Sequence, residues 1–302
     1  MTPAGTQVIP AVVIGGYLGA GKTTLVNHLL RAADGRRIAV LVNDFGEIAI
    51  DADLILGAEG GVLSLAGGCV CCTIGEDLIG ALETLLAREP RPDLLLIETS
   101  GVGMPGAVAQ TVSLLADLVV EGVVVLMDAE TVRSAAEDRY VGDTVMRQLA
   151  QADLLLLNKT DLLTPGMAND TAQWLGSLAL PAPIVETDHN RLPSALIFGP
   201  AGPGEARALH HHADEIFETG VFLPDGPVDL DRLGLALSDP ACGILRAKGA
   251  LTGLDGVRRG VQLAGRRWRL SDPGSLGEGL VWIARKNAVQ RGRIFADLSV
   301  SW

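Results

Sequence analysis

One stretch of this sequence decides the fold: Gly16-Tyr-Leu-Gly-Ala-Gly-Lys-Thr23, which lies between an apolar run and a helical pattern. The apolar run, Val8 to Gly15, has the composition of a buried strand, and the segment from Thr23 to Ala33 has a helical pattern. Glycines at this spacing let consecutive backbone N–H groups curl around phosphate oxygens, and the following helix presents its positive end. The stretch therefore predicts a phosphate-binding loop of the P-loop kind.

The loop supplies most of the expected nucleotide contacts. We expect Lys22 to reach the β- and γ-phosphates, Thr23 to meet Mg²⁺ through its hydroxyl, and Thr24 to support the α-phosphate side. Lys22 is also a candidate catalytic residue. The alternative interpretation is a glycine-rich strand-to-helix turn with an incidental lysine. The expected nucleotide-binding residues of the loop are Gly16, Gly19, Ala20, Gly21, Lys22, Thr23 and Thr24.

Around the loop, short β-branched or leucine-rich runs alternate with helical patterns, as a parallel sheet buried on both faces requires. We therefore expect an α/β P-loop domain with a mostly parallel sheet over residues 1–192. The other expected strands are Arg37–Asn43, Asp93–Glu98, Gly122–Met127, Asp153–Leu157 and Pro183–Thr187, and a further helix is expected over Asp77–Ala87.

The later part of the chain predicts a second, smaller domain. Residues 193–225 include a stretch rich in Pro, Gly and Ala, followed by His210, His211 and His212, and are the expected linker. Residues 226–302 are expected to form a small α+β domain. Its expected elements are a helix over Asp229–Leu237 and strands over Ile244–Leu251, Val261–Leu270, Leu280–Ala284 and Ile294–Val300.

Charge is distributed unevenly along the 302 residues, whose net charge is -12. From Ile244 to Trp302 there are 11 Lys and Arg against 4 Asp and Glu, a net charge of +7, which leaves -19 on the first 243 residues. The basic end has its arginines alternating with apolar residues in strand-like runs, which argues against nucleic-acid binding. A solvated sheet face that docks on the acidic first domain is the favoured interpretation.

Membrane insertion and export are not expected. No window approaches about 18 uninterrupted apolar residues, because Asp117 and Glu121 break the most apolar stretch, Leu114–Met127. The first ten residues carry no positive charge ahead of their apolar run, so they do not resemble a signal peptide. We expect a cytoplasmic protein without a membrane partner.

A second motif, Asn158-Lys-Thr-Asp161, follows an apolar strand and so falls at a strand's carboxyl end, where open α/β sheets bind ligands. The Asp161 carboxylate can accept hydrogen bonds from N1–H and the amino group of guanine, whereas adenine would leave it unpaired at a cost of about 1–3 kcal/mol. Asn158, Lys159 and Asp161 are therefore expected to bind guanine, so that GTP and GDP are the ligands. Alone, the motif could be a surface turn; the upstream phosphate loop favours guanine.

Between these motifs, Leu94-Leu-Leu-Ile-Glu98 delivers a carboxylate next to a tight glycine turn that ends at Gly101. Glu98 is the candidate for the Mg²⁺ environment and a candidate catalytic residue that could position water. The Gly101 N–H can sense the γ-phosphate. A simple cap at a helix N-terminus is compatible with the same residues.

Three of the four cysteines, Cys69, Cys71 and Cys72, fall within four residues of a glycine-flanked loop. Bridges between such close cysteines are strained, so the cluster is expected to be reduced thiolates. Thiolates favour soft ions, here Zn²⁺ or Cu(I), with Co²⁺ also compatible, and leave an open position for an exchanged ligand. Buried structural cysteines and a redox relay are the alternatives. The isolated Cys242 is expected in a core.

Two other groups of side chains are weaker candidates for the metal. Asn43-Asp-Phe-Gly-Glu47 ends the second strand, so Asp44 and Glu47 could reach nucleotide Mg²⁺, the sulfur-bound metal, or water; Asp44 is thus also a catalytic candidate. His210 to His212 could feed metal to the thiolates, although a short histidine run in a linker is more often only exposed.

Together these residues resemble the CobW family of GTPases, relatives of the nickel-enzyme maturation GTPases. The phosphate loop, Asn43–Glu47, Gly67-Gly-Cys-Val-Cys-Cys72, Glu98–Gly101 and Asn158–Asp161 occur in the family's order, and Arg246-Ala-Lys-Gly249 is similar to the start of its C-terminal domain. The resemblance implies a GTP-dependent metallochaperone or insertase for zinc, cobalt or another metal, with that role for the three clustered cysteines. The sequence departs from the family at Asp44, commonly Glu, at Ser100, often Thr, and in its short histidine stretch.

The function that we predict is a GTPase that binds a thiophilic metal, zinc before cobalt, and delivers it to a client metalloprotein that the sequence does not identify. GTP and Mg²⁺ would order the segment from Asn43 to Cys72 on the metal, and hydrolysis would release it. A nucleotide-gated metal sensor would use the same sites. A P-loop kinase is disfavoured by the guanine motif, and a cargo-partitioning ATPase by the lack of a lysine near the start of the loop. A homodimer is left open.

Overall fold

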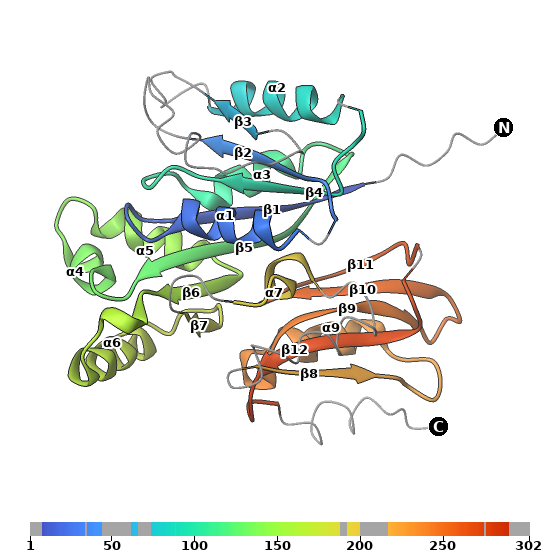
Figure 1. Cartoon of the computed structure of the whole chain (residues 1–302). Helices are drawn as coiled ribbons and strands as arrows, with labels where there is room; N and C mark the ends of the chain where they lie inside the picture. The colour runs from blue at the N-terminus through green and yellow to red at the C-terminus, as the bar shows by residue number, and fades with distance from the viewer. Residues whose placement is uncertain are drawn as a thin grey trace. The chain divides into compact units, whose positions relative to one another are not determined.

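The computed structural model describes residues 8–33, 35–43, 62–65, 74–87, 89–187, 192–199, 217–274 and 276–289 (Figure 1). These residues form two compact units. The first includes the described residues up to Leu180 and those from Ile184 to 187. The second includes Pro181–Pro183 and the described residues from Leu192 onward.

The first unit is built on a parallel sheet whose described strands follow the order β3-β2-β4-β1-β5-β6-β7. Strands β2 to β4 lie on one side of β1 and strands β5 to β7 on the other, so the carboxyl end of β1 is a topological switch point. The expected mostly parallel α/β fold is confirmed. The strands are β1 (Ile9–Gly16), β2 (Ile38–Asn43), β3 (Val62–Leu65), β4 (Leu94–Glu98), β5 (Leu118–Asp128), β6 (Leu154–Asn158) and β7 (Ile184–Glu186).

Helices cover both faces of this sheet, which explains why its central strands are apolar up to their last residues. β4 reads Leu-Leu-Leu-Ile-Glu and β6 reads Leu-Leu-Leu-Leu-Asn, and every residue of both is buried. Helix α1 contacts β1 and β4, while α3 and α5 contact β1 and β5 from behind the sheet in the view of Figure 1. The helices are α1 (Lys22–Arg31), α2 (Ile74–Leu86), α3 (Pro105–Val112), α4 (Val132–Glu137), α5 (Gly142–Gln151) and α6 (Pro165–Ser177), with a 3-10 turn, η2, at Thr160–Leu162.

The second unit is an antiparallel sheet on which helices pack. Its described strands follow the order β11-β10-β9-β12-β8. Helix α9 contacts β9, β10 and β11, and its Leu233 and Leu237 enter a core with Trp282. The elements are α7 (Ala195–Phe198), β8 (Phe217–Phe222), α9 (Leu230–Ser238), η4 (Pro240–Cys242), β9 (Ile244–Thr252), β10 (Arg258–Ala264), β11 (Arg267–Ser271) and β12 (Gly279–Arg285).

Three sequence expectations differ from the structure of the second unit or fall outside it. The expected single strand Val261–Leu270 was wrong: it is a hairpin, because Gly265, at φ 55°, lets the chain reverse between β10 and β11. The expected linker, 193–225, includes α7 and β8. β8 pairs with β12, and the local composition of the sequence does not reveal this pairing. The expected strand Ile294–Val300 lies outside the described residues.

None of the helices in the described ranges is long and apolar enough to cross a bilayer.

Candidate functional site

The candidate site lies where four neighbouring strands of the first sheet end. Parallel pairing sets Ile14 of β1 opposite Glu98 of β4, Gly16 opposite Leu126 of β5, and Asp128 of β5 opposite Asn158 of β6. Because parallel strands have their carboxyl ends at one edge, the sheet brings the phosphate loop, Glu98 and the guanine motif together.

The phosphate loop has the backbone that a wrapped phosphate requires. Gly16, Gly19 and Gly21 all have positive φ angles, of 136°, 78° and 99°, which L side chains rarely adopt. At Gly19 a Cβ atom would meet no heavy atom within 4 Å, whereas at Gly16 it would lie 2.4 Å from the Leu126 carbonyl oxygen. Only glycine therefore fits at position 16, where the start of the loop lies close to the backbone of β5. At position 19 the loop has open space beside it.

Helix α1 begins where the loop ends, so the partial positive charge of the helix N-terminus lies at the loop. Gly21 is the N-cap and makes no side-chain cap bond, and the first turn contains no acidic residue. Lys22 is 8% exposed, and its Nζ donates a 3.5 Å hydrogen bond to the Tyr17 carbonyl. Ala20 is buried and Thr24 is exposed. A helix N-terminus with a lysine folded over its own loop is chemically suited to polyphosphate oxygens.

Thr23 and Glu98 are brought together across 75 positions of sequence. The Thr23 hydroxyl donates a 2.8 Å hydrogen bond to Glu98 Oε1, and Glu98 is only 2% exposed. A hydroxyl and a carboxylate are both hard oxygen donors of the kind that Mg²⁺ prefers. The pair therefore fits a nucleotide-associated Mg²⁺.

The guanine motif touches the phosphate loop directly. Asn158 is 2% exposed, and its Nδ2 donates a 3.0 Å hydrogen bond to the Ala20 carbonyl. The next residue, Lys159, turns the chain with a φ of 63°, and Asp161 follows in η2 with its side chain exposed. The amide of Asn158 thus links the end of β6 to the glycine-rich loop after β1.

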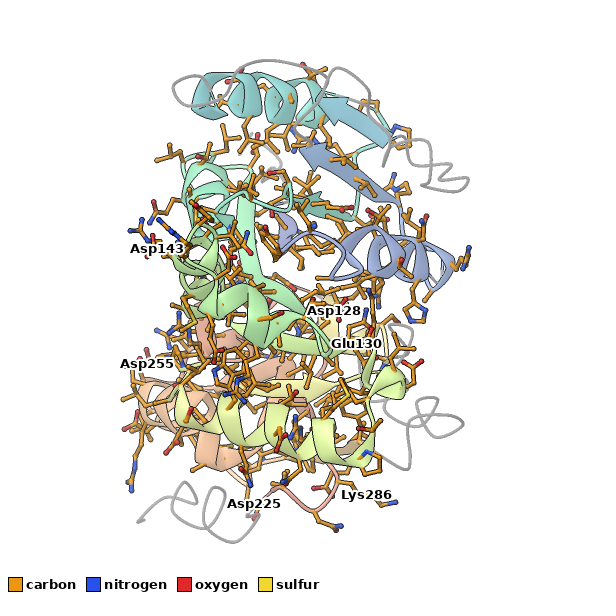
Figure 2. All side chains as sticks on the ribbon, turned by 90° about the vertical axis from the view of Figure 1, so that its left-hand side faces the viewer. Asp128, Glu130, Asp143, Asp225, Asp255 and Lys286 are labelled. Atoms are coloured by element: carbon orange, nitrogen blue, oxygen red, sulfur yellow. The ribbon has the colours of Figure 1, made fainter. Side chains whose placement is uncertain are left out.

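Asp128 is a site residue that the sequence analysis did not identify. It ends β5, is 9% exposed, and its Oδ2 accepts a 2.6 Å hydrogen bond from Lys159 Nζ. Its Oδ1 accepts from the backbone N–H of Glu130 at 3.0 Å, and Figure 2 shows both residues near the carboxyl end of β5. Glu98 was identified because a polar residue ends an apolar strand, and Asp128 has the same pattern. Asp128 was missed because the expected strand ended at Met127.

The expected thiolate site falls where the structure gives no description. Cys69, Cys71, Cys72, Asp44, Glu47 and His210 to His212 all lie outside the described residues. Among the residues that are described, no group of three or more His, Cys, Asp or Glu side chains could hold a metal ion. Cys242 is 4% exposed within the core of the second unit, as expected, and burial raises the pKa of its thiol.

Known proteins similar to this chain give the same family. Residues 10–186 match the family described as CobW/HypB/UreG, nucleotide-binding domain. The chain is 32% identical to the zinc chaperone CobW of Sinorhizobium sp over 83% of this chain and 80% of that protein. It is 33% identical to the zinc chaperone YjiA of Escherichia coli strain K12 over 80% of this chain and 81% of that protein.

A third relative is matched over less of its length. Identity to zinc-regulated GTPase metalloprotein activator 1 of Schizosaccharomyces pombe is 34%, over 61% of this chain and 47% of that protein. The family match covers more than half of the chain, and the CobW resemblance drawn from the motifs is confirmed. The chain therefore belongs to the CobW/HypB/UreG family and is a P-loop GTPase.

Proposed function

We propose that this GTPase is a zinc metallochaperone that holds the ion on a thiolate loop in one nucleotide state and delivers it to a client protein. The names of the relatives, zinc chaperone and zinc-regulated GTPase metalloprotein activator, support the metal and the role. The observation that carries the nucleotide half is the hydrogen bond from Asn158 Nδ2 to the Ala20 carbonyl, because it joins the base motif to the phosphate loop in one buried unit.

The phosphate end of the site would bind the triphosphate through the loop backbone and Lys22. Gly16, Gly19, Ala20, Gly21, Thr23 and Thr24 complete the proposed set. Thr23 and Glu98, already 2.8 Å apart through oxygen atoms, would hold Mg²⁺. Mg²⁺, when bound, supplies charge that offsets the negative charge on the phosphate oxygens. The protein would hold the γ-phosphate in one orientation. Glu98 and Asp44 are the candidates to position the attacking water.

The base end would select guanine through Asp161. Its carboxylate can accept from both N1–H and the exocyclic amino group, and adenine offers neither pattern. Lys159 would be kept in place by its 2.6 Å contact with Asp128.

Zinc is proposed as the cargo of Cys69, Cys71 and Cys72. Three thiolates fill three of the four coordination positions of a tetrahedral zinc ion. The fourth position stays open for a ligand of the client during transfer. Asp44 and Glu47 are proposed as additional oxygen ligands, and cobalt is the alternative metal. A change of nucleotide would alter zinc affinity by ordering the segment that connects β2 to the cysteines.

Replacing the thiolates tests this assignment. In a chain with Cys69→Ala, Cys71→Ala and Cys72→Ala, we expect stoichiometric zinc binding to be lost while the affinities for GDP and a GTP analogue are kept. Cys242→Ala is the matched control, since that thiol is buried in the other unit, and it should bind zinc normally. Unchanged zinc affinity in the triple variant would contradict the assignment.

A nucleotide-gated zinc sensor would use the same sites and differ in its partner. A carrier should transfer its zinc to a captured apoprotein when GTP is hydrolysed. A sensor should bind its partner in one nucleotide state and keep the zinc. Capture of partners with GTP and with GDP, followed by zinc analysis of both proteins, separates the two.

A further inference from the structure

A buried glutamine on α5, Gln148, has no role in the site described so far. It is 1% exposed, and its amide nitrogen donates two hydrogen bonds, to the carbonyl of Gly101 at 3.1 Å and to that of Gly103 at 2.8 Å. Both hydrogens of the amide are therefore used on the loop that follows β4. A side chain so placed fixes the path of that loop.

A second glutamine continues the contact one helical turn later. Gln151 Oε1 accepts a 2.9 Å hydrogen bond from the backbone N–H of Gly106 in the first turn of α3. The N-cap of α3, Met104, makes no side-chain cap bond of its own, so Gln151 satisfies a donor that the helix leaves open. Residues three apart on a helix share a face, so α5 presents both amides to one continuous segment, 101–106.

The same loop also packs against the phosphate loop. At Gly101 a Cβ atom would lie 2.3 Å from Leu18 Cδ2 and 3.0 Å from the Leu18 backbone nitrogen. Gln148 also lines a small cavity together with Tyr17 and Leu18. Gly101 thus packs against Leu18 of the phosphate loop and accepts a hydrogen bond from the amide of Gln148.

We propose that Gln148 is a positioning residue for γ-phosphate recognition, acting through the backbone of Gly101. The inference rests on the proposed nucleotide site, in which the Gly101 N–H meets the γ-phosphate. GDP has no γ-phosphate, so a displaced Gly101 costs GTP affinity and leaves GDP affinity intact. Gln151 has the same role to a smaller degree, because it holds the far end of the loop.

The test compares two dissociation constants, for GDP and for a non-hydrolysable GTP analogue, both with Mg²⁺, in the full-length chain. Gln148→Met keeps the length of the side chain and removes both donors. We expect the dissociation constant of the analogue to rise about tenfold and that of GDP to change less than about twofold. The matched control is Gln173→Met, on the exposed surface of α6, which should change neither.

Equal weakening of both nucleotides would overturn the inference, because it would mean that Gln148 supports the fold alone; so would no change in either. If Gln148→Met does not fold, Gln151→Met decides in its place, with a smaller rise confined to the analogue. A wild-type chain that bound neither guanine nucleotide would instead overturn the nucleotide site itself. If the wild-type chain binds GDP and the GTP analogue with different affinities and the variants keep the same ratio of affinities, only the role of Gln148 is contradicted.

Discussion

The side-chain amide of Asn158 donates a 3.0 Å hydrogen bond to the carbonyl of Ala20, across 138 positions of sequence. Asn158 ends β6 and Ala20 lies in the loop after β1, and both are buried. The contact joins the two segments that we propose bind the base and the phosphates. Any ligand that spans both segments depends on it.

Loss of this bond should weaken every guanine nucleotide to a similar degree. Asn158→Ala leaves the Ala20 carbonyl buried without this donor, which costs about 1–3 kcal/mol. We expect the dissociation constants for GDP and for a GTP analogue to rise in parallel by roughly tenfold, measured by calorimetry. Asn169→Ala, at an exposed position of α6, is the control and should leave both constants unchanged. A loss confined to the triphosphate would contradict the account.

Asp161 should set the preference for guanine over hypoxanthine. Inosine nucleotides lack the exocyclic amino group of guanine. Only a protein that keeps the Asp161 carboxylate can therefore use a contact to that group to distinguish GTP from ITP. We expect wild-type protein to hydrolyse GTP with the higher kcat/KM, and Asp161→Ala to lower that value by about tenfold or more while ITP is affected less. Asp170→Ala on α6 controls for the loss of an exposed negative charge. Equal losses for the two nucleotides would argue against a contact to the amino group.

Glu98 should govern the Mg²⁺ requirement of hydrolysis. Glu98→Gln keeps the side chain's shape and an oxygen for the Thr23 hydroxyl, but removes the negative charge that a cation needs nearby. The Mg²⁺ concentration for half-maximal GTP hydrolysis should rise by about tenfold or more. GDP binding measured in EDTA should stay as in the wild type. If the Mg²⁺ titration is unchanged, Glu98 is a structural residue alone.

One acid-dependent contribution to stability is expected in the second unit. Asp255 Oδ1 accepts hydrogen bonds from Arg259 Nη1 at 2.9 Å and from the backbone N–H of Val257 at 3.0 Å. The hydrogen bond from Arg259 is the main reason that the pKa of Asp255 is lowered to about 2, from about 3.9 in an unfolded chain. A lowered pKa stabilises the fold above pH about 4, and this stabilisation disappears as the pH falls through about 2.

Asp255→Asn should therefore lower the thermal midpoint at pH 7 by more than it does at pH 2, where wild type and variant converge. Thermal unfolding followed by circular dichroism across that range measures the difference. Asp225→Asn is the matched control at another exposed aspartate, and Figure 2 labels both. A difference that is the same at both pH values would mean that the charge of Asp255 contributes nothing.

The sequence allowed the residues of the candidate site to be placed together because they lie at the ends of apolar strands. Glu98 and Asn158 each end an apolar strand, and the parallel sheet then brings strand ends to one edge without further information. Asp128 carried the same landmark and was missed when the expected strand was ended one residue early. Local pattern also failed at Gly265, because a positive φ in a short turn is hard to distinguish from a glycine inside a strand.

Gln148 and Gln151 could not have been predicted in this way. Nothing in the α5 sequence distinguishes a glutamine that faces solvent from one that donates to the Gly101 and Gly103 carbonyls. Those bonds exist only because the fold places the loop that follows β4 against α5. The thiolate assignment, in contrast, is still a prediction from Cys69, Cys71 and Cys72 alone.

The most direct test of the central claim is the zinc affinity of the wild-type chain in two nucleotide states. Chelator competition would give the zinc dissociation constant with GDP and with a non-hydrolysable GTP analogue, each with Mg²⁺. The account predicts tighter binding with the analogue, by about fivefold or more, the usual range for coupled sites. Equal affinity in both states would contradict it, because a ligand without differential affinity for two states shifts no equilibrium between them.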